Sequence, residues 1–192
     1  MLRYLLPNRK AISALIAGKF YLKNVIGKIV ELIKKKIFQN CFFFLIILFL
    51  FFIDRASKNY ILNFFLDQKI DTYYINSILN FTLIWNSGIA FGLFKGDGFS
   101  YNLMSLFILC IILFLFVCLI QSKDKFEKFN ISLVIGGALG NFYDRFFFNA
   151  VPDFIDLHYL DFHWFIFNVA DIIITFGIIL LLLSNIFIKK NV

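Results

Sequence analysis

The sequence predicts an all-α membrane protein with four transmembrane helices and a small β-sheet on one membrane surface. Three observations support this fold class. Of the 192 residues, 61% are hydrophobic and only 16% are charged, a composition far from that of a soluble domain. The apolar residues gather in four long runs that polar segments separate. The lysines at the ends of these runs fall on one side of the four predicted crossings.

The positive charge is concentrated in the N-terminal part of the chain. Residues 1–40 hold nine lysines and arginines against the single acid Glu31, and the remaining residues sum to a net charge of −1. We therefore attribute the charge to one flank of a membrane protein and not to nucleic-acid binding. The three cysteines match no metal or disulfide spacing, and we interpret them as small buried hydrophobic residues. They are Cys41, Cys110 and Cys118.

Residues 1–36 form a basic N-terminal extension whose apolar residues recur at roughly helical spacing. This pattern suits a helix that lies on an anionic membrane surface. A poorly ordered leader, or a start site assigned too early, is the alternative. No small-residue cleavage site follows the apolar run 41–53, so we do not interpret this run as a removed signal peptide.

Residues 37–188 form the predicted four-span membrane domain. The first span covers about residues 37–58 and includes the thirteen apolar residues 41–53. Because a crossing needs about twenty residues, the helix must carry polar residues to the far interface. Asp54 and Lys58 are four positions apart, so they lie on one helical face and can form a pair.

The other three spans are predicted at about 102–120, 131–147 and 164–188. Within the polar segment 61–99, residues 72–75 and 81–85 are β-prone, and a turn at Asn86-Ser87-Gly88 follows the second of them. We therefore expect a small sheet at the membrane surface between the first two spans. A second polar segment, 149–163, separates the last two spans.

The lysines fix the predicted orientation. Lys34–Lys36, the loop 121–130 and Lys189-Lys190 fall on the same side of the four crossings, and the positive-inside rule makes that side cytoplasmic. Both termini are then cytoplasmic, and the polar segments 61–99 and 149–163 are periplasmic. Five polar residues consequently gather near the outer interface. They are Asp54, Asn86, Asp144, Asp153 and Asp171.

Asp171 lies inside an apolar span, where an ionisable residue is costly and usually functional. Two carboxylates held together in a low-dielectric site share a proton near neutral pH. The ionised carboxylate can take a proton from water, and the protonated one can polarise a carbonyl, without a cofactor. Asn168 lies one helical turn before Asp171 on the same face. Asp144 is a third candidate, but its neighbour Arg145 suggests a paired, permanently ionised carboxylate.

The two histidines are the other candidates for chemistry. His158 and His163 lie among Asp153, Asp156 and Asp161, which are possible metal ligands. No helical HExxH or similar spacing is present. We therefore expect no metal site here and interpret the histidines as interfacial side chains that face water. No Ser–His–Asp or Cys–His arrangement competes with the aspartates.

Five short motifs occur in order along the chain. They are Asp54-x-x-Ser57-Lys58, Asn86-x-Gly88-x-Ala90-Phe91, Gly140-Asn141-x-x-Asp144-Arg145, Val151-x-Asp153-Phe154 and Phe167-Asn168-x-Ala170-Asp171. Each motif alone is weak, but the ordered set on four spans closely resembles lipoprotein signal peptidase, the type II signal peptidase of bacteria. The resemblance covers about residues 38–188 and leaves out the basic extension. Pro152 departs from the aliphatic residue usual in the family.

The resemblance implies an aspartyl endopeptidase of the bacterial inner membrane. Such enzymes cleave diacylglyceryl-modified prolipoproteins just before the lipidated cysteine, use no cofactor or metal, and carry a β-cradle on the periplasmic surface. Their partners are prolipoproteins and membrane lipids, with no nucleic acid. The resemblance makes Asp153 and Asp171 the catalytic pair. Substrate binding or support of the site is implied for Asn86, Gly88, Asn141, Arg145, Asn168, Asp54, Lys58 and Asp144.

Two other classes of function compete with a peptidase. A small proton-coupled transporter would also embed aspartates in its helices, as a proton relay. A relay should extend toward the cytoplasm, whereas these acids crowd the outer interface. A structural subunit of a membrane assembly has less support, because it would not need the second aspartate.

Overall fold

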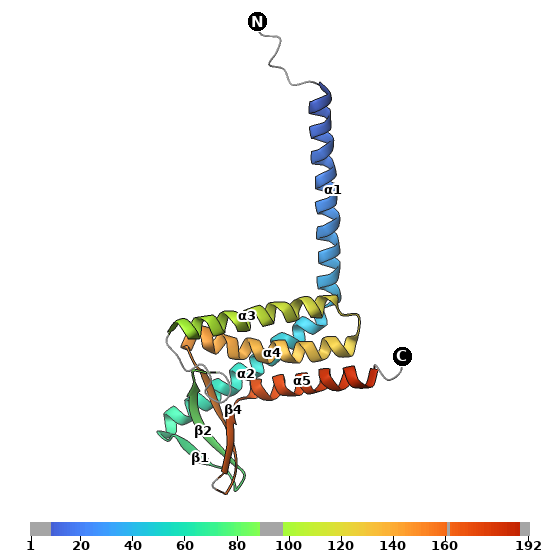
Figure 1. The fold of residues 1–192 in the computed structure, drawn as a ribbon. Helices are drawn as coiled ribbons and strands as arrows, with labels where there is room; N and C mark the ends of the chain where they lie inside the picture. Colours follow the sequence, from blue (N-terminus) through green and yellow to red (C-terminus); the bar gives the residue numbers. More distant parts are fainter. Residues whose placement is uncertain (1–8, 89–97, 161, 189–192) are drawn as a thin grey trace. The chain divides into compact units, whose positions relative to one another are not determined.

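The computed structural model describes residues 9–88, 98–160 and 162–188 (Figure 1). The chain divides into two units, Met1–Cys41 and Phe42–Val192, which are described separately. The first unit contains one long helix, α1 (Arg9–Gln39). Leu22, Ile26, Ile29 and Ile33 recur along α1 every three or four residues, and all four are exposed. The extension is therefore an amphipathic helix with an uncovered apolar stripe.

The second unit combines a helical bundle with one antiparallel sheet. Its helices are α2 (Cys41–Gln68), α3 (Gly98–Gln121), α4 (Lys125–Phe148) and α5 (Val169–Ile188). Its strands are β1 (Thr72–Tyr74), β2 (Leu79–Asn86), β3 (Val151–Tyr159) and β4 (Phe162–Phe167), in the spatial order β1-β2-β3-β4. In Figure 1, α3, α4 and α5 lie side by side, and the sheet extends from one end of them.

Helix α4 is capped at both ends by residues that explain where it starts and stops. Asp124 precedes the helix and accepts hydrogen bonds from the backbone N–H groups of Phe126 (2.6 Å) and Glu127 (3.2 Å), as an N-cap does. Asn149 follows the helix in the left-handed region, with φ of 57°, a conformation that asparagine tolerates better than most residues. This turn directs the chain from α4 into β3, the strand that carries Asp153.

The first apolar helix is longer than the sequence indicates. We expected residues 61–99 to be a polar segment, but α2 continues to Gln68. Ile61 and Phe65, four residues apart on α2, are buried against Phe154 of β3. This contact explains why α2 is longer than predicted, because the last turns of the helix pack against the sheet.

The sheet confirms the two β-prone stretches and adds two strands. β1 and β2 lie where strands were predicted, whereas β3 and β4 form from the second polar segment and the residues after it. The predicted start of the fourth span at Trp164 is wrong, because residues 162–167 pair with β3 and the helix begins at Val169. The run Trp164–Phe167 is apolar in either structure, so composition did not distinguish a strand from a helix.

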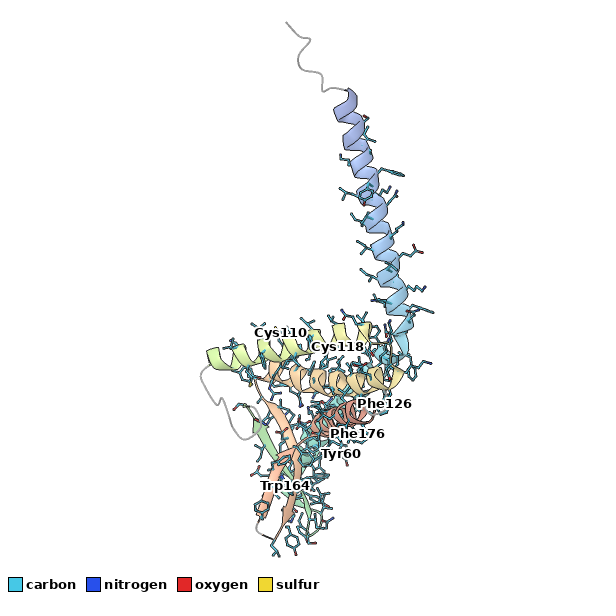
Figure 2. All side chains as sticks on the ribbon, turned by 45° about the vertical axis from the view of Figure 1, so that its right-hand side comes forward. Tyr60, Cys110, Cys118, Phe126, Trp164 and Phe176 are labelled. Atoms are coloured by element: carbon cyan, nitrogen blue, oxygen red, sulfur yellow. The ribbon has the colours of Figure 1, made fainter. Side chains whose placement is uncertain are left out.

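Large apolar side chains cover the outside of the helices. Figure 2 shows examples at Tyr60 and Phe176, which are exposed. Cys41 and Cys110 are exposed too, and Cys118 is half-buried, so the prediction that the cysteines are buried is wrong. Among the described residues, one helix, α3, is long and apolar enough to cross a membrane. Helices α1 and α2, if counted together as one span, would add a second crossing.

Glycines in α4 allow the neighbouring helices to approach closely. A Cβ atom at Gly136 would lie 2.8 Å from Leu50 Cβ of α2, and one at Gly137 would lie 2.7 Å from the Ala170 carbonyl oxygen of α5. A Cβ at Gly140 would overlap the carboxylate of Asp54. The small residues of the GGALG stretch, 136–140, therefore allow α2 and α5 to pack closely against α4.

We predict that Gly140→Ala destabilises the protein, because the added methyl group displaces the Asp54 carboxylate. Overpacking of this kind costs about 1–3 kcal/mol. Thermal unfolding in detergent, followed by the fluorescence of Trp85 and Trp164, should give a lower Tm. Gly27→Ala is the matched control, because a Cβ there meets nothing within 4 Å. Equal Tm values for the two variants would contradict the proposed close contact.

Candidate functional site

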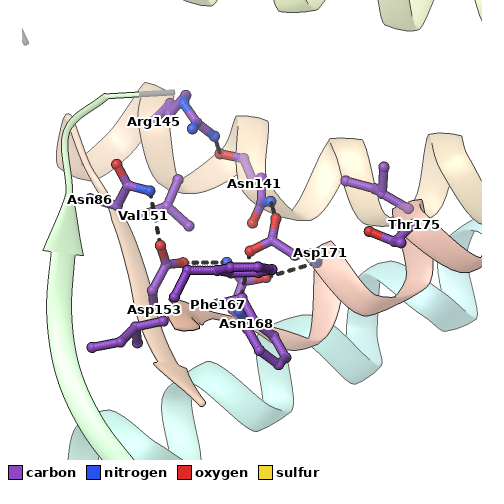
Figure 3. A pocket seen from close by; sticks show the side chains of 12 residues that line it. Asn86, Asn141, Arg145, Val151, Asp153, Phe167, Asn168, Asp171 and Thr175 are labelled. Carbon is purple, nitrogen blue, oxygen red and sulfur yellow. Dashed lines mark hydrogen bonds between the residues drawn. The ribbon is translucent and has the colours of Figure 1, made fainter. Parts of the chain in front are cut away.

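A cavity of about 330 Å³ opens where the sheet meets the helices (Figure 3). It is lined by Asn86, Asn141, Arg145, Val151, Asp153, Phe165, Ile166, Phe167, Asn168, Asp171, Ile174 and Thr175. These residues come from β2, α4, β3, β4, α5 and the turn before α5. The cavity thus brings together both predicted catalytic aspartates and four of the predicted supporting residues.

Asp153 projects from β3 and is only 3% exposed. Its carboxylate accepts hydrogen bonds from the amide groups of Asn168 (2.6 Å) and Asn86 (2.9 Å). Burial, followed by the negative charge of Asp171, raises the pKa of Asp153 to about 6, although the two amide hydrogen bonds act in the opposite direction. This group therefore changes its protonation state close to neutral pH.

Asp171 lies in the first turn of α5, three residues after Asn168. The Asp171 carboxylate accepts from the Asn168 backbone N–H, and the Asn168 side-chain oxygen accepts from the Asp171 backbone N–H, both at 3.1 Å. This reciprocal arrangement is a capping box. The Asp171 carboxylate accepts a second hydrogen bond from the amide of Asn141 (2.8 Å). Helix capping thus holds Asp171 and Asn168 in one rigid unit.

Asn168 also connects the two aspartates. Its oxygen is occupied by the N–H of Asp171, which leaves its NH₂ group to donate to Asp153. An asparagine amide has one acceptor end and one donor end, so the helix cap determines which end faces Asp153. Asn168 therefore binds Asp153 of β3 through its side-chain NH₂ group and the Asp171 carboxylate of α5 through its backbone N–H.

The other two asparagines are oriented in the same way. The oxygen of Asn86 accepts from the Gly88 N–H (3.0 Å), so its NH₂ group faces Asp153. The oxygen of Asn141 accepts from the Lys58 ammonium (2.8 Å), so its NH₂ group faces Asp171. The cavity thus offers its carboxylates hydrogen-bond donors rather than further oxygen ligands. The two carboxylates are therefore held by neutral amide donors.

Lys58 is fully buried behind the cavity. Its ammonium donates to the carboxylates of Asp54 (2.9 Å) and Asp144 (2.8 Å) and to the oxygen of Asn141. The predicted Asp54–Lys58 pair is therefore present, but it belongs to a larger network. All three ammonium protons have partners, as a buried lysine requires.

The expected pairing of Asp144 with Arg145 is wrong. Asp144 binds Lys58 and the guanidinium of Arg55, which also donates to Asp54 (2.8 Å). Arg55 lies on α2, one turn before Lys58, whereas Arg145 follows Asp144 on a different face of α4. The position of Arg55 three residues before Lys58 on one helix was the signal that sequence reasoning missed.

Arg145 instead points to the cavity. Its guanidinium donates to the carbonyl oxygens of Gly88 (3.1 Å) and Asn141 (3.5 Å), and its Nε has no hydrogen-bond partner among the described residues. The backbone carbonyl of Arg145 accepts from the Tyr101 hydroxyl (2.7 Å). Arg145 is therefore a buried cation whose hydrogen-bonding capacity is only partly used.

Asp54 links the buried charges to the start of α5. One of its oxygens accepts from the Ala170 N–H (3.1 Å), while the other binds Lys58 and Arg55. The first N–H groups of a helix lack partners within the helix and attract negative charge. Asp54 thus fixes the end of the helix that carries Asp171.

The histidines lie outside this cavity. The side chain of His163 is 53% exposed and forms an ion pair with the buried Asp156 at 3.0 Å. Exposure to water was expected for both histidines, but Nδ1 of His158 is buried. Asp153 belongs to the cavity and not to this group, and Asp161 lies outside the described residues.

Comparisons with known proteins identify relatives over most of the chain. The model of the family described as signal peptidase (SPase) II matches residues 46–187. A lipoprotein signal peptidase of Pelagibacter ubique is 48% identical over 148 residues, which cover 76% of this chain and 88% of that protein. A lipoprotein signal peptidase of Francisella tularensis subsp. novicida is 34% identical over 153 residues, covering 78% and 94%.

Solved structures show the same fold. A bacterial membrane enzyme solved at 2.3 Å by the in meso method has a TM-score of 0.62 and 29% identity, covering 78% of this chain and 90% of that chain. A second one, solved at 1.9 Å, has a TM-score of 0.57 and 30% identity, covering 74% and 90%. The architecture of helices with a small antiparallel sheet is therefore that of a membrane enzyme.

The pKa of Asp153 predicts how stability depends on pH. Because the folded-state pKa is about 6 and the usual value is 3.8, the folded protein binds more protons than the unfolded chain between these values. Stability should therefore fall as the pH rises from about 4 to about 7, by up to about 3 kcal/mol from this group. We expect Asp153→Asn to remove this component. Thermal unfolding of both proteins across this range tests it, and parallel curves would contradict it.

Proposed function

The chain belongs to the signal peptidase II family, and we propose that it is an aspartyl endopeptidase that removes signal peptides from prolipoproteins. The proposed substrates are diacylglyceryl-modified prolipoproteins, cleaved just before the lipidated cysteine. The names of the relatives, lipoprotein signal peptidases, support this substrate class. The observation that carries the proposal is the joining of Asp153 and Asp171 through one asparagine in a single cavity.

Asp153 and Asp171 divide the proton transfers between them. One carboxylate, ionised, takes a proton from the attacking water; the other, protonated, donates a hydrogen bond to the carbonyl oxygen of the scissile peptide. The pKa of Asp153, raised to about 6, supports a pair that holds one proton near neutral pH. The proton then passes to the leaving amine, and both carboxylates return to their starting states. These steps need no cofactor.

The three asparagines hold the carboxylates in position for these steps. Each presents an NH₂ group to an aspartate, because its oxygen is already bound by Gly88, Lys58 or Asp171. Lys58, Asp54 and Asp144 act as positioning residues, since they reach the cavity only through Asn141 and α5. Arg145, which has unused donors, is suited to hold a carbonyl group of the substrate chain.

The remaining walls of the cavity suit a lipid-modified substrate. Val151, Phe165, Phe167 and Ile174 contribute apolar surface beside the polar pair. Acyl chains attached next to the scissile bond can remain in an apolar environment while the peptide reaches the aspartates. A site at the edge of the bilayer meets both requirements, because water enters from one side and lipid from the other.

We further propose that residues 37–188 cross the bacterial inner membrane four times, with both termini cytoplasmic and the cavity at the periplasmic interface. The apolar outer surfaces of α2, α3, α4 and α5 support this arrangement. Charged residues lower the hydropathy of α2 and α4, but three of them, Asp54, Lys58 and Asp144, are buried and paired inside the bundle. Such pairing is how membrane helices accommodate ionisable groups.

Helix α1 is proposed to lie on the cytoplasmic membrane surface. Its apolar stripe and its lysines, among them Lys23 and Lys34, match an anionic lipid surface. The alternative of a proton-coupled transporter is not favoured. Family membership supports a peptidase, and the buried acids gather at the sheet end of the helices instead of forming a path along them.

Substitution of either aspartate should abolish cleavage. Asp153→Asn and Asp171→Asn each remove one partner of the proton transfer, which costs about 10²–10⁴-fold in rate. The double variant should be little worse than either single variant, because residues that act as a unit are not additive. The measurement is release of the signal peptide from a purified lipidated prolipoprotein, expressed per folded molecule.

Two further variants control this experiment. Asp67→Asn changes an exposed carboxylate on α2 and should leave cleavage unchanged. Asp144→Asn should lower the yield of folded protein, because it leaves Arg55 and Lys58 with too little negative charge. If Asp144→Asn is folded and inactive while Asp153→Asn retains turnover, then Asp144 and Asp171 form the pair instead.

The orientation is tested by labelling single cysteines with a membrane-impermeant maleimide. In a variant that lacks the three native cysteines, positions 76 and 159 should react from the periplasm, and position 125 only after the membrane is opened. Asn76, Tyr159 and Lys125 are all exposed, so burial does not limit the reaction. Labelling of position 125 in intact cells would overturn the proposed topology.

A further inference from the structure

A second cluster of polar groups lies on the sheet, away from the cavity. Asp156 and His158 of β3 and His163 of β4 each offer one ligand atom, and these atoms all lie within 4.8 Å of one another. None of the three residues lines the cavity. The sequence spacing alone predicted no metal site at these histidines, but on the geometry of the folded hairpin we propose that this cluster binds a zinc ion, which connects β3 to β4 and stabilises the hairpin.

The spacing of the ligand atoms suits zinc. Nδ1 of His163 lies 3.0 Å from both carboxylate oxygens of Asp156. Ligand atoms about 2.0–2.1 Å from a tetrahedral zinc ion are separated by about 3.3 Å, so only a small movement admits the ion. His158 and His163 are paired across the two strands, with ring centroids 5.3 Å apart. The strand register shifts between Asp156 and His158.

Buried polar atoms without hydrogen-bond partners lie in and beside the cluster. Nδ1 of His158 and Oδ1 of Asn80 are buried and have no hydrogen-bond partner among the described residues. Asn80 lies directly opposite Asp156 on β2. A buried polar atom without a partner destabilises the folded state. The interaction of Asp156 with His163 alone gives the imidazole of His158 no partner, whereas a metal ion would bind it together with the other two side chains.

The chemistry of the donors selects the type of metal. Two imidazoles and one carboxylate suit Zn²⁺, while Ca²⁺ and Mg²⁺ prefer sites made only of oxygen atoms. The hydroxyl of Thr82 donates to the Asp156 carboxylate at 3.3 Å, the kind of contact that orients a ligand from behind. His163 is half exposed, so the fourth position can be taken by water.

The proposed ion is structural and takes no part in peptide cleavage. It would hold β3 three residues beyond Asp153, on the strand that carries one of the two cavity aspartates. Loss of the ion should therefore lower the stability of the sheet, while cleavage per folded molecule is retained. This separates the zinc site from the proposed function, because either one can fail without the other.

The test uses the full chain purified in detergent with a tag that contains no histidine, since a polyhistidine tag would bind zinc itself. After treatment with EDTA and desalting, ZnCl₂ is added and the bound zinc is measured by mass spectrometry after a second desalting step. We expect one zinc ion per chain and a higher Tm. His158→Gln should bind zinc at least about tenfold more weakly, since residues behind the ligands alone are worth about 10–100-fold.

His158→Gln is the decisive variant, because Nδ1 of His158 has no partner to lose and the ion pair of His163 remains. Asp67→Asn is the matched control and should bind zinc as the unaltered chain does. Asp156→Asn and His163→Gln should also lose zinc. If the unaltered chain retains no more zinc than His158→Gln, or if its Tm does not respond to zinc, the cluster is only an ion pair and the proposal is wrong.

Discussion

The rest of the site depends on the ion pairs that the buried ammonium of Lys58 forms with two carboxylates. The ammonium lies between the carboxylates of Asp54 and Asp144, and Arg55 supplies the second positive charge. Two acids and two bases thus form a neutral group in the interior. Removing one member of such a group leaves an unpaired buried charge, at a cost of about 3–5 kcal/mol. The group joins α2 to α4, and Asp54 extends it to the first turn of α5.

A chain of hydrogen bonds through asparagine amides connects this charged group to the two aspartates of the cavity and fixes their orientation. Lys58 fixes Asn141, which donates to Asp171; Asp171 fixes Asn168, which donates to Asp153. An amide is suited to this role because its two ends are different and it carries no charge. The amides therefore position the two carboxylates without adding further positive charge, which would favour their ionised forms. A buried pair that retains a proton depends on neutral donors of this kind.

The sheet supplies what the helices cannot. A helix can place a carboxylate at its first turn, where capping holds it, as it does for Asp171. The facing carboxylate must come from another direction, and β3 provides Asp153 from the side. The buried contact of Phe154 with Ile61 and Phe65 fixes that strand on the extended end of α2. The same helix thus supports the sheet at one point and the charged group at another.

The sequence by itself determined the class of protein and the family, and it singled out the two aspartates and four of the polar residues that line one cavity. Composition and the periodicity of apolar residues carry this information locally, and short motifs in a fixed order carry the rest. The Asp54–Lys58 pair was predictable because both residues lie on one helix, four positions apart. The stretches 72–75 and 81–85, which contribute to β1 and β2, were predictable because they are rich in β-branched and aromatic residues and the turn Asn86-Ser87-Gly88 follows the second of them.

Only the tertiary structure decided which charges pair and where apolar segments change from strand to helix. Asp144 pairs with Arg55 of α2 and not with its neighbour Arg145, because partners on two different helices are set by packing and not by distance along the chain. Trp164 lies in a strand. The apolar residues around it are compatible with a strand or a helix, and pairing with β3 selects the strand. The assembly of Asp156, His158 and His163 also required the hairpin, since register between strands is set by pairing. Long-range contacts of this kind leave no periodic signal in a single sequence.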